Sequence, residues 1–148
     1  MKLSTRARYG IHAMFELAAR YGQGPQPLKS IAESQNIPEQ YLEQLIALLR
    51  REGLVESVRG AQGGYMLGKA PGDITMGELM HVLEGPILLA DCLADDKNCE
   101  RSCACPTKGV WERLSKSMDD VLNSVTLQDM LDDHKRMMAE SAHKEENP

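Results

Sequence analysis

Residues 28–67, LKSIAESQNIPEQYLEQLIALLRREGLVESVRGAQGGYML, decide the fold of this chain. Apolar residues recur at helical spacing on both sides of the break SQNIP at 34–38: Leu28, Ile31 and Ala32 precede it, and Leu42, Leu45, Ile46 and Leu49 follow it. Pro38 suits the start of the helix that follows this break, the third helix of the chain, because a missing backbone N–H costs little in the first turn. Two helices joined by a tight turn are typical of a helix-turn-helix.

The second half of this stretch predicts a β-hairpin. The runs LVESV (54–58) and YMLG (65–68) are rich in strand-forming residues, and the glycines of RGAQGG (59–64) allow the backbone angles of a turn. A helix-turn-helix followed by a hairpin is the winged-helix arrangement, in which one helix enters the DNA major groove and the hairpin reaches the flanking backbone. The alternative is a small α+β domain with no nucleic-acid role.

Amphipathic helices are also predicted on either side of this unit. Before it, residues 4–22 show helical periodicity with Ser4 as N-cap and Gly22 as a stop. After it, DITMGELMHVLEGP (73–86) contains a capping box from Thr75 to Glu78 and a hydrophobic staple from Ile74 to Leu79.

A long helix capped by Thr107 should follow, with an apolar stripe made of Val110, Leu114, Met118, Val121 and Leu122. Nothing adjacent in sequence covers this stripe, so we expect it to pair with a second chain. A last short helix begins at Thr126, and the tail from His134 is expected to fray.

The expected fold is mainly α with a small β-hairpin wing, that is, a winged helix-turn-helix plus a long dimerisation helix. Residues 1–85 would form the DNA-binding domain, 86–107 a cysteine-bearing loop, 108–132 the dimerisation helix and a short C-terminal helix, and 133–148 a flexible tail.

Charge is distributed unevenly along the 148 residues, although the net charge is −5. Residues 1–70 carry nine Lys/Arg against six Asp/Glu, whereas residues 71–148 carry eight against sixteen. A basic front half suits a phosphate-binding module. No secretory signal and no apolar run of about 20 residues is present, so we expect a cytoplasmic protein with no membrane segment. The sequence shows no grouping of catalytic residues of the kind that would indicate an enzyme.

All four cysteines, Cys92, Cys99, Cys103 and Cys105, lie within fourteen positions. In a reducing cytoplasm such thiols are more often metal ligands or redox groups than disulfides. A structural zinc site normally shows two CxxC-like pairs, which this spacing lacks. Thiolates spread over a loop suit an iron-sulfur cluster better. Zinc, disulfides and a redox switch remain the alternatives.

Several motifs together resemble a known family: STRARYG (4–10), YLEQLIALLRREGLVESVRGAQGGYMLG (41–68), ITMGELMHVLEGP (74–86) and CPTKGVW (105–111). The chain up to about residue 132 is similar to the winged-helix iron-sulfur cluster transcription regulators of bacteria, the family of IscR, NsrR and CymR. The resemblance implies a homodimer that binds a pseudo-palindromic operator in double-stranded DNA. Some members carry a [2Fe-2S] cluster, and others lack the cysteines.

The resemblance also implies cluster ligands. It selects Cys92, Cys99 and Cys105, and leaves Cys103 as an extra thiol. Where IscR-like relatives have a ligand histidine, this chain has Lys108, which cannot bind iron while protonated. The fourth ligand is then expected from elsewhere: His12 on the partner's first helix is one candidate, and Asp95, Asp96 and Glu100 are others. His12 could equally be an ordinary surface histidine.

For DNA, the resemblance implies base contacts from the start of the third helix, whose available side chains are Glu39, Gln40, Tyr41, Glu43 and Gln44. Gln can pair with adenine and Glu can accept from cytosine. The expected phosphate contacts are Arg6, Arg8, Arg50, Arg51 and Arg59. The predicted function is a repressor whose DNA binding responds to the cluster and which controls iron-sulfur biogenesis genes. A cysteine- or sulfur-metabolism repressor with redox-active thiols is the alternative, because LEGPI (83–87) resembles that branch; a metal-binding scaffold is a third.

Overall fold

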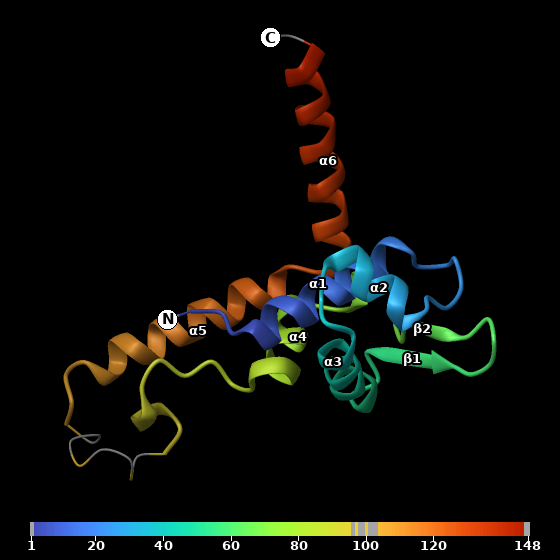
Figure 1. Ribbon diagram of the computed structural model, residues 1–148. Coiled ribbons are helices and arrows are strands. Elements are labelled where there is room, and N and C mark those ends of the chain that lie inside the picture. Colours follow the sequence, from blue (N-terminus) through green and yellow to red (C-terminus); the bar gives the residue numbers. More distant parts are fainter. Residues whose placement is uncertain (1, 96, 98–99, 101–103, 147–148) are drawn as a thin grey trace.

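Four helices and a two-stranded hairpin surround one apolar core, and two further helices leave that core in different directions (Figure 1). The computed structural model describes residues 2–95, 97, 100 and 104–146. The elements are α1 (Thr5–Ala19), α2 (Leu28–Gln35), α3 (Glu39–Arg51), β1 (Val55–Val58), β2 (Gly64–Leu67), η1 (Pro71–Asp73), α4 (Met76–Glu84), η2 (Asp91–Leu93), α5 (Lys108–Ser124) and α6 (Leu127–Glu146). The predicted winged helix-turn-helix fold is confirmed.

Helix starts follow the predicted caps in two of three cases. The Ser4 hydroxyl accepts a 3.0 Å hydrogen bond from the amide of Ala7, and the Thr75 hydroxyl accepts one of 3.1 Å from Glu78. Thr107 is different: it immediately precedes α5, but its hydroxyl lies 3.1 Å from the Cys105 thiol and makes no capping bond. The predicted cap at Thr107 is therefore wrong, because its side chain is engaged by the cysteine loop.

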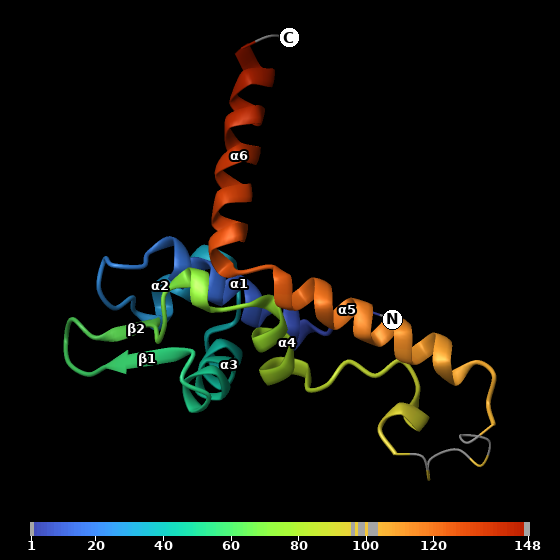
Figure 2. The same cartoon turned by 180° about the vertical axis from the view of Figure 1, so that it is seen from behind.

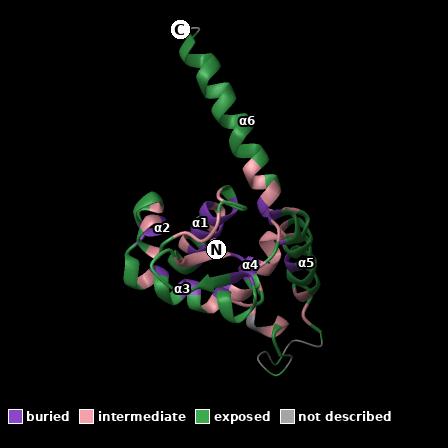
Figure 3. Cartoon of the chain, turned by 90° about the vertical axis from the view of Figure 1, so that its right-hand side faces the viewer, coloured by how far each residue is buried: buried purple, intermediate pink, exposed green. Residues whose placement is uncertain are grey.

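The core lies where α1, α3 and α4 meet (Figure 3). The predicted apolar faces of α2 and α3 are buried in it, together with residues from α1, α4, β1 and the start of α6; its largest fully buried side chains include Met14, Leu17, Ile31, Leu42, Leu45, Ile46, Leu49, Leu79, Leu83 and Leu127. Each such leucine contributes about 1.5–3 kcal/mol relative to an exposed position. This core fixes the exposed face of α3 relative to the hairpin.

The hairpin, called the wing below, pairs β1 and β2 antiparallel with Val55 opposite Leu67 and Val58 opposite Gly64. Its base is buried through Val55 and Leu67, whereas Val58 is exposed. Gly60 takes a φ of 112° at the turn, a conformation that glycine adopts most easily. The predicted strands and turn are confirmed.

The C-terminal part is more helical than predicted. Helix α6 runs over Leu127–Glu146, so the short C-terminal helix ending near residue 132 was wrong. Thr126 and Asp129 form a reciprocal capping box at its start, with hydrogen bonds of 2.9 and 3.1 Å. Beyond this cap, no glycine or proline interrupts the chain before Pro148, and good helix formers such as Lys, Arg, Met, Ala and Glu predominate. The helix extends away from α3 and the wing, as both opposite views show (Figures 1 and 2).

Candidate nucleic-acid interface and cysteine loop

Helix α3 presents a polar face to solvent opposite its buried leucines. Glu39, Gln40, Glu43 and Gln44 are all exposed on its first two turns. A recognition helix contacts base edges mainly through N-terminal residues, so these four side chains have the position that base contacts require. The structure therefore brings together on one exposed face four of the five side chains that the sequence predicted for this role, the exception being Tyr41.

Tyr41 lies between the polar face and the core. It is half-buried, and its ring packs edge-on against Tyr9 of α1 with a centroid distance of 5.9 Å. Its body therefore supports the contact between α1 and α3, and only part of the ring is accessible.

The arginines predicted to contact phosphate are exposed at three places. Arg6 and Arg8 lie in the first turn of α1, Arg50 and Arg51 end α3, and Arg59 follows β1 at the wing turn. In the part of the chain that the structure describes, none of these five has a carboxylate within ion-pairing distance, in contrast to Arg20. Their charge is thus available to a polyanion.

A buried acidic residue that the sequence interpretation missed lies behind this surface. Glu16 of α1 is only 8% exposed, and its two carboxylate oxygens accept hydrogen bonds from Arg20 at 2.8 Å and from Gln35 at 2.9 Å. Arg20 also donates to the side chain of Gln26 at 3.0 Å. Helical periodicity offered no signal for it, because Glu16 falls on the side of α1 opposite Ala7, Ile11, Met14 and Ala18. Once buried, a carboxylate needs such partners.

The cysteine loop lies at the opposite end of the molecule from the wing, beside the start of α5 (Figure 1). Cys92 is half-buried in η2, which packs against α5, and Cys105 is half-buried three residues before α5 begins. Cys99 and Cys103, as well as Asp96, lie outside the described residues.

No group of three or more His, Cys, Asp or Glu side chains that could hold a metal occurs among the described residues. His12 is exposed and lines a groove between α1 and α6 of about 990 Å³, together with Phe15 and His134, whose rings pack edge-on at 5.3 Å. Asp95 and Glu100 are exposed near the cysteines.

The apolar stripe of α5 divides into two parts. Met118 and Leu122 are half-buried on a helix that packs against α4, so these two of the five predicted residues are partly covered within the chain, contrary to prediction. Val110, Leu114 and Val121 stay exposed, at 54%, 46% and 62%. Trp111 is exposed as well, at 38%, and the other exposed side chains of the helix are mainly charged or polar.

Lys116 illustrates that charged surface. Its hydrogen bond to Asp120 at 2.8 Å raises its pKa, and the charge of Asp120 acts in the same direction. A polar side and a bare apolar side on one helix are typical of a helix at an interface.

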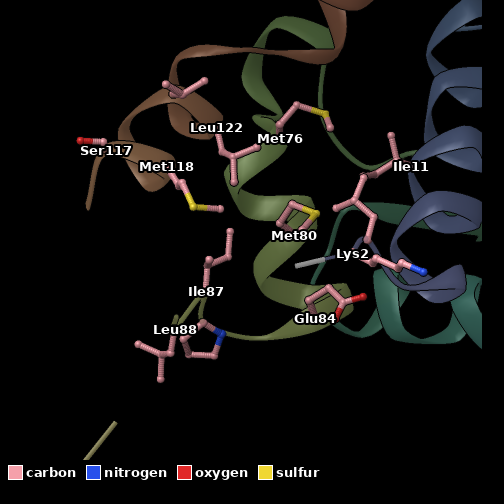
Figure 4. Close-up of a pocket in the computed structure, with 13 residues that line it drawn as sticks. Lys2, Ile11, Met76, Met80, Glu84, Ile87, Leu88, Ser117, Met118 and Leu122 are labelled. Atoms are coloured by element: carbon pink, nitrogen blue, oxygen red, sulfur yellow. The ribbon is translucent and has the colours of Figure 1, made fainter. Parts of the chain in front are cut away.

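An apolar groove of about 520 Å³ adjoins this exposed part of α5 (Figure 4). Ile11 from α1, Met76 and Met80 from α4, and Met118 from α5 point into it. Leu88, from the segment that leads to the cysteine loop, is 45% exposed at its edge. The groove and the exposed side of α5 thus form one continuous apolar surface beside that segment.

None of the described helices is both long enough and apolar enough to cross a membrane.

Comparison with known proteins places these features in context. The family model Rrf2, described as an iron-dependent transcriptional regulator, matches residues 3–133. The HTH-type transcriptional regulator CymR of Bacillus subtilis is 47% identical over 130 residues, which cover 88% of this chain and 89% of CymR. The HTH-type transcriptional regulator IscR of Klebsiella pneumoniae is 38% identical over 131 residues, which cover 88% of this chain and 80% of IscR.

Solved structures give the same two likenesses. The structure of T. potens IscR matches with a TM-score of 0.75 and 50% identity, and covers 90% of this chain and 88% of IscR. The structure of CymR, the global cysteine regulator of B. subtilis, matches with a TM-score of 0.74 and 46% identity, and covers 88% of this chain and 95% of CymR. These relatives are regulators, not enzymes.

Proposed function

The chain belongs to the Rrf2 family of DNA-binding transcription regulators, and from this premise we propose that it is a homodimeric repressor whose DNA binding responds to a [2Fe-2S] cluster. It would act in the cytoplasm on a pseudo-palindromic operator and control iron-sulfur cluster biogenesis genes. The observation that carries the proposal is the position of the four thiols, on a loop that joins α4 to the proposed dimerisation helix.

The donor set fits an iron-sulfur cluster. Thiolates are the usual ligands of such clusters, and the loop supplies Cys92, Cys99 and Cys105, with Cys103 as an extra thiol. The fourth ligand in this proposal is His12 of the other subunit, because His12 is exposed on α1. A bound cluster would supply a centre that is lost or oxidised when conditions change.

DNA binding is assigned to α3 and the wing. Gln40 and Gln44 offer amides to adenine, and Glu39 and Glu43 offer acceptors to the cytosine amino group. The five exposed arginines would contact phosphates and offset the repulsion between these glutamates and the DNA backbone.

Dimerisation is assigned to α5. A second copy would cover Val110, Leu114 and Val121 together with the groove beside Met80. Since Ile87 and Leu88 at one end of the cysteine loop line this groove and the other end leads into α5, cluster binding by the loop can change how the two subunits pack. A tenfold preference of the cluster for one dimer conformation gives about 1.4 kcal/mol of coupling to DNA binding.

A second function is favoured by one specific observation. CymR of B. subtilis is 47% identical, and its solved structure is described as the global cysteine regulator. In this alternative the chain represses cysteine- or sulfur-metabolism genes, and the four thiols are redox-active without a cluster.

One experiment separates the two functions. The protein is purified anaerobically, its visible absorbance and its iron and sulfide content are measured, and its binding to duplexes selected from a random pool is compared with and without reconstitution. Iron-sulfur absorbance together with an altered set of bound duplexes supports the cluster-responsive regulator. Colourless protein with one iron-independent set of sites, whose binding changes on thiol oxidation, supports the sulfur-metabolism repressor.

A further inference from the structure

A line of polar contacts runs from the helix-turn-helix to the wing, away from the cysteine loop. It begins at Gln35 at the end of α2, passes through Glu16 and Arg20, and reaches Gln26 in the segment between α1 and α2. The Gln26 side chain also donates to the carbonyl of Gly24 at 3.2 Å, which holds this segment in a bend. Every side chain in the line thus contacts the next one.

The line continues into the wing through the backbone. Gln26 and Tyr65 exchange two backbone hydrogen bonds, each of 2.8 Å, so that residue 26 acts as a short third strand beside β2. The approach is close: a Cβ on Gly64 would collide with the backbone of Gln26. Since Tyr65 pairs with Ser57, one step from the end of the ladder at Val58 and Gly64, this attachment is made near the wing tip.

The wing is held by packing at its base and, on the β2 side, by Tyr65, which is half-buried against the core, whereas β1 has little packing beyond its first residue. Val55 and Leu67 are buried, but Glu56, Ser57 and Val58 are exposed. An isolated two-stranded hairpin is only marginally stable in water. The position of Arg59, directly beyond β1, therefore depends on what holds the outer part of the wing.

We propose that Arg20 and Gln26 are positioning residues for DNA binding: anchored by the buried carboxylate of Glu16, they hold the segment that fixes the wing, and so place Arg59 against a DNA phosphate. Neither side chain need touch DNA for this role. The inference rests on the proposed DNA-binding surface and adds to it the element that sets the position of one phosphate contact.

The test uses the full-length protein and a duplex that the wild type selects from a random pool. Gln26→Leu removes the acceptor for Arg20 at similar volume. Gln23→Leu is the matched control, since Gln23 is exposed in the same segment and its side chain makes none of the contacts in the line. We expect Gln26→Leu to weaken DNA binding roughly tenfold, because the charge-assisted contact between Arg59 and a phosphate would be lost. The slope of log K against log salt should flatten by about one unit. Gln23→Leu should change neither quantity.

A double-mutant cycle with Arg59→Ala tests the mechanism. If Gln26 acts through Arg59, Gln26→Leu should have little further effect once Arg59 is absent, so the two changes are not additive. Additive losses in affinity and slope would overturn the inference while leaving the DNA-binding function intact. If the wild type selects no duplex at all, the DNA-binding function itself is wrong and this inference falls with it.

Amide hydrogen exchange separates local loosening of the wing from general destabilisation. In Gln26→Leu, exchange at the Tyr65 amide should accelerate, whereas exchange at the Gly68 amide, which bonds Leu54 at the wing base, should stay near its wild-type rate. Equal acceleration at both amides would mean that the substitution merely destabilises the fold, and would overturn the positioning role.

Discussion

The amide of Met76, at the start of α4, donates a 2.8 Å hydrogen bond to the carbonyl of Val125, at the junction of α5 and α6. Next to it, the amide of Leu127 donates to the carbonyl of Ile74 at 3.0 Å. These two bonds join the proposed dimerisation helix to the DNA-binding domain by backbone contacts. A rearrangement of α5 therefore has a direct structural connection to α4, which packs on α1 and α3.

Leu127 should be the residue on which this junction depends most. It is fully buried in the core, so Leu127→Ala should lower the free energy of unfolding by about 2–5 kcal/mol, measured by urea denaturation. Met138→Ala on the same helix is the control: Met138 is 59% exposed, and we expect a change of no more than about 0.5 kcal/mol. Equal effects of the two changes would show that the start of α6 is not part of the core.

The dimer interface can be tested on α5. Replacing Leu114 and Val121 together by Glu places two charges on the exposed apolar side, so we expect monomers in light scattering at a concentration where the wild type is dimeric. Lys116→Ala and Asp120→Ala, together on the charged surface, should leave the dimer unchanged. A dimer that survives the double glutamate change would place the interface elsewhere.

Gln44→Ala should change which sequences are bound rather than how strongly all are bound. An exposed amide on a recognition helix discriminates one base pair, so we expect a loss of about 1–3 kcal/mol of discrimination at a single operator position. Competition with single-base operator variants measures this. The effect would differ from that of Arg59→Ala, which should weaken binding to every sequence and flatten the salt dependence by about one unit. If Gln44→Ala, like Arg59→Ala, weakened binding to every sequence equally, the assignment of α3 as the recognition helix would be wrong.

The cysteine assignment predicts three sensitive positions and one insensitive position. After anaerobic reconstitution, the alanine variants at Cys92, Cys99 and Cys105 should lose the iron-sulfur absorbance bands, whereas Cys103→Ala should keep them. Loss of the absorbance bands in Cys103→Ala with their retention in Cys99→Ala would show that the ligand set is shifted. If none of the four substitutions has an effect and no variant binds iron, the sulfur-metabolism repressor is favoured.

His12 provides a separate check on the shared site. His12→Ala should make the cluster less stable towards chelators. Mixed dimers of His12→Ala and Cys92→Ala chains should then retain one intact site if His12 acts on the partner's loop. Mixed dimers without any intact site would place the fourth ligand within the same chain.

The sequence by itself determined the local structure. The spacing of the leucines in 28–49, the turn glycines after Val58 and the hydroxyls of Ser4 and Thr75 predicted the helices, the wing and two caps, because periodicity and capping act over a few residues. The same pattern also predicted which side of α3 is exposed. It did not predict the length of α6. Whether the segment after residue 132 is helical or frayed depends on weak helix propensities, because no stop signal marks a helix end there.

Only the tertiary structure decided which of these elements meet. Glu16 and Gln35 are 19 positions apart, and Gln26 and Tyr65 are 39 apart, so no local pattern indicated that they form one line of contacts. Likewise, two of the five residues of the α5 stripe are partly covered, because α5 packs against α4 and the backbone bond between Met76 and Val125 joins them. Helical periodicity alone cannot reveal this contact. Periodicity specifies the face that a helix buries, whereas its partner depends on how the whole chain packs to satisfy buried polar groups and fill the core.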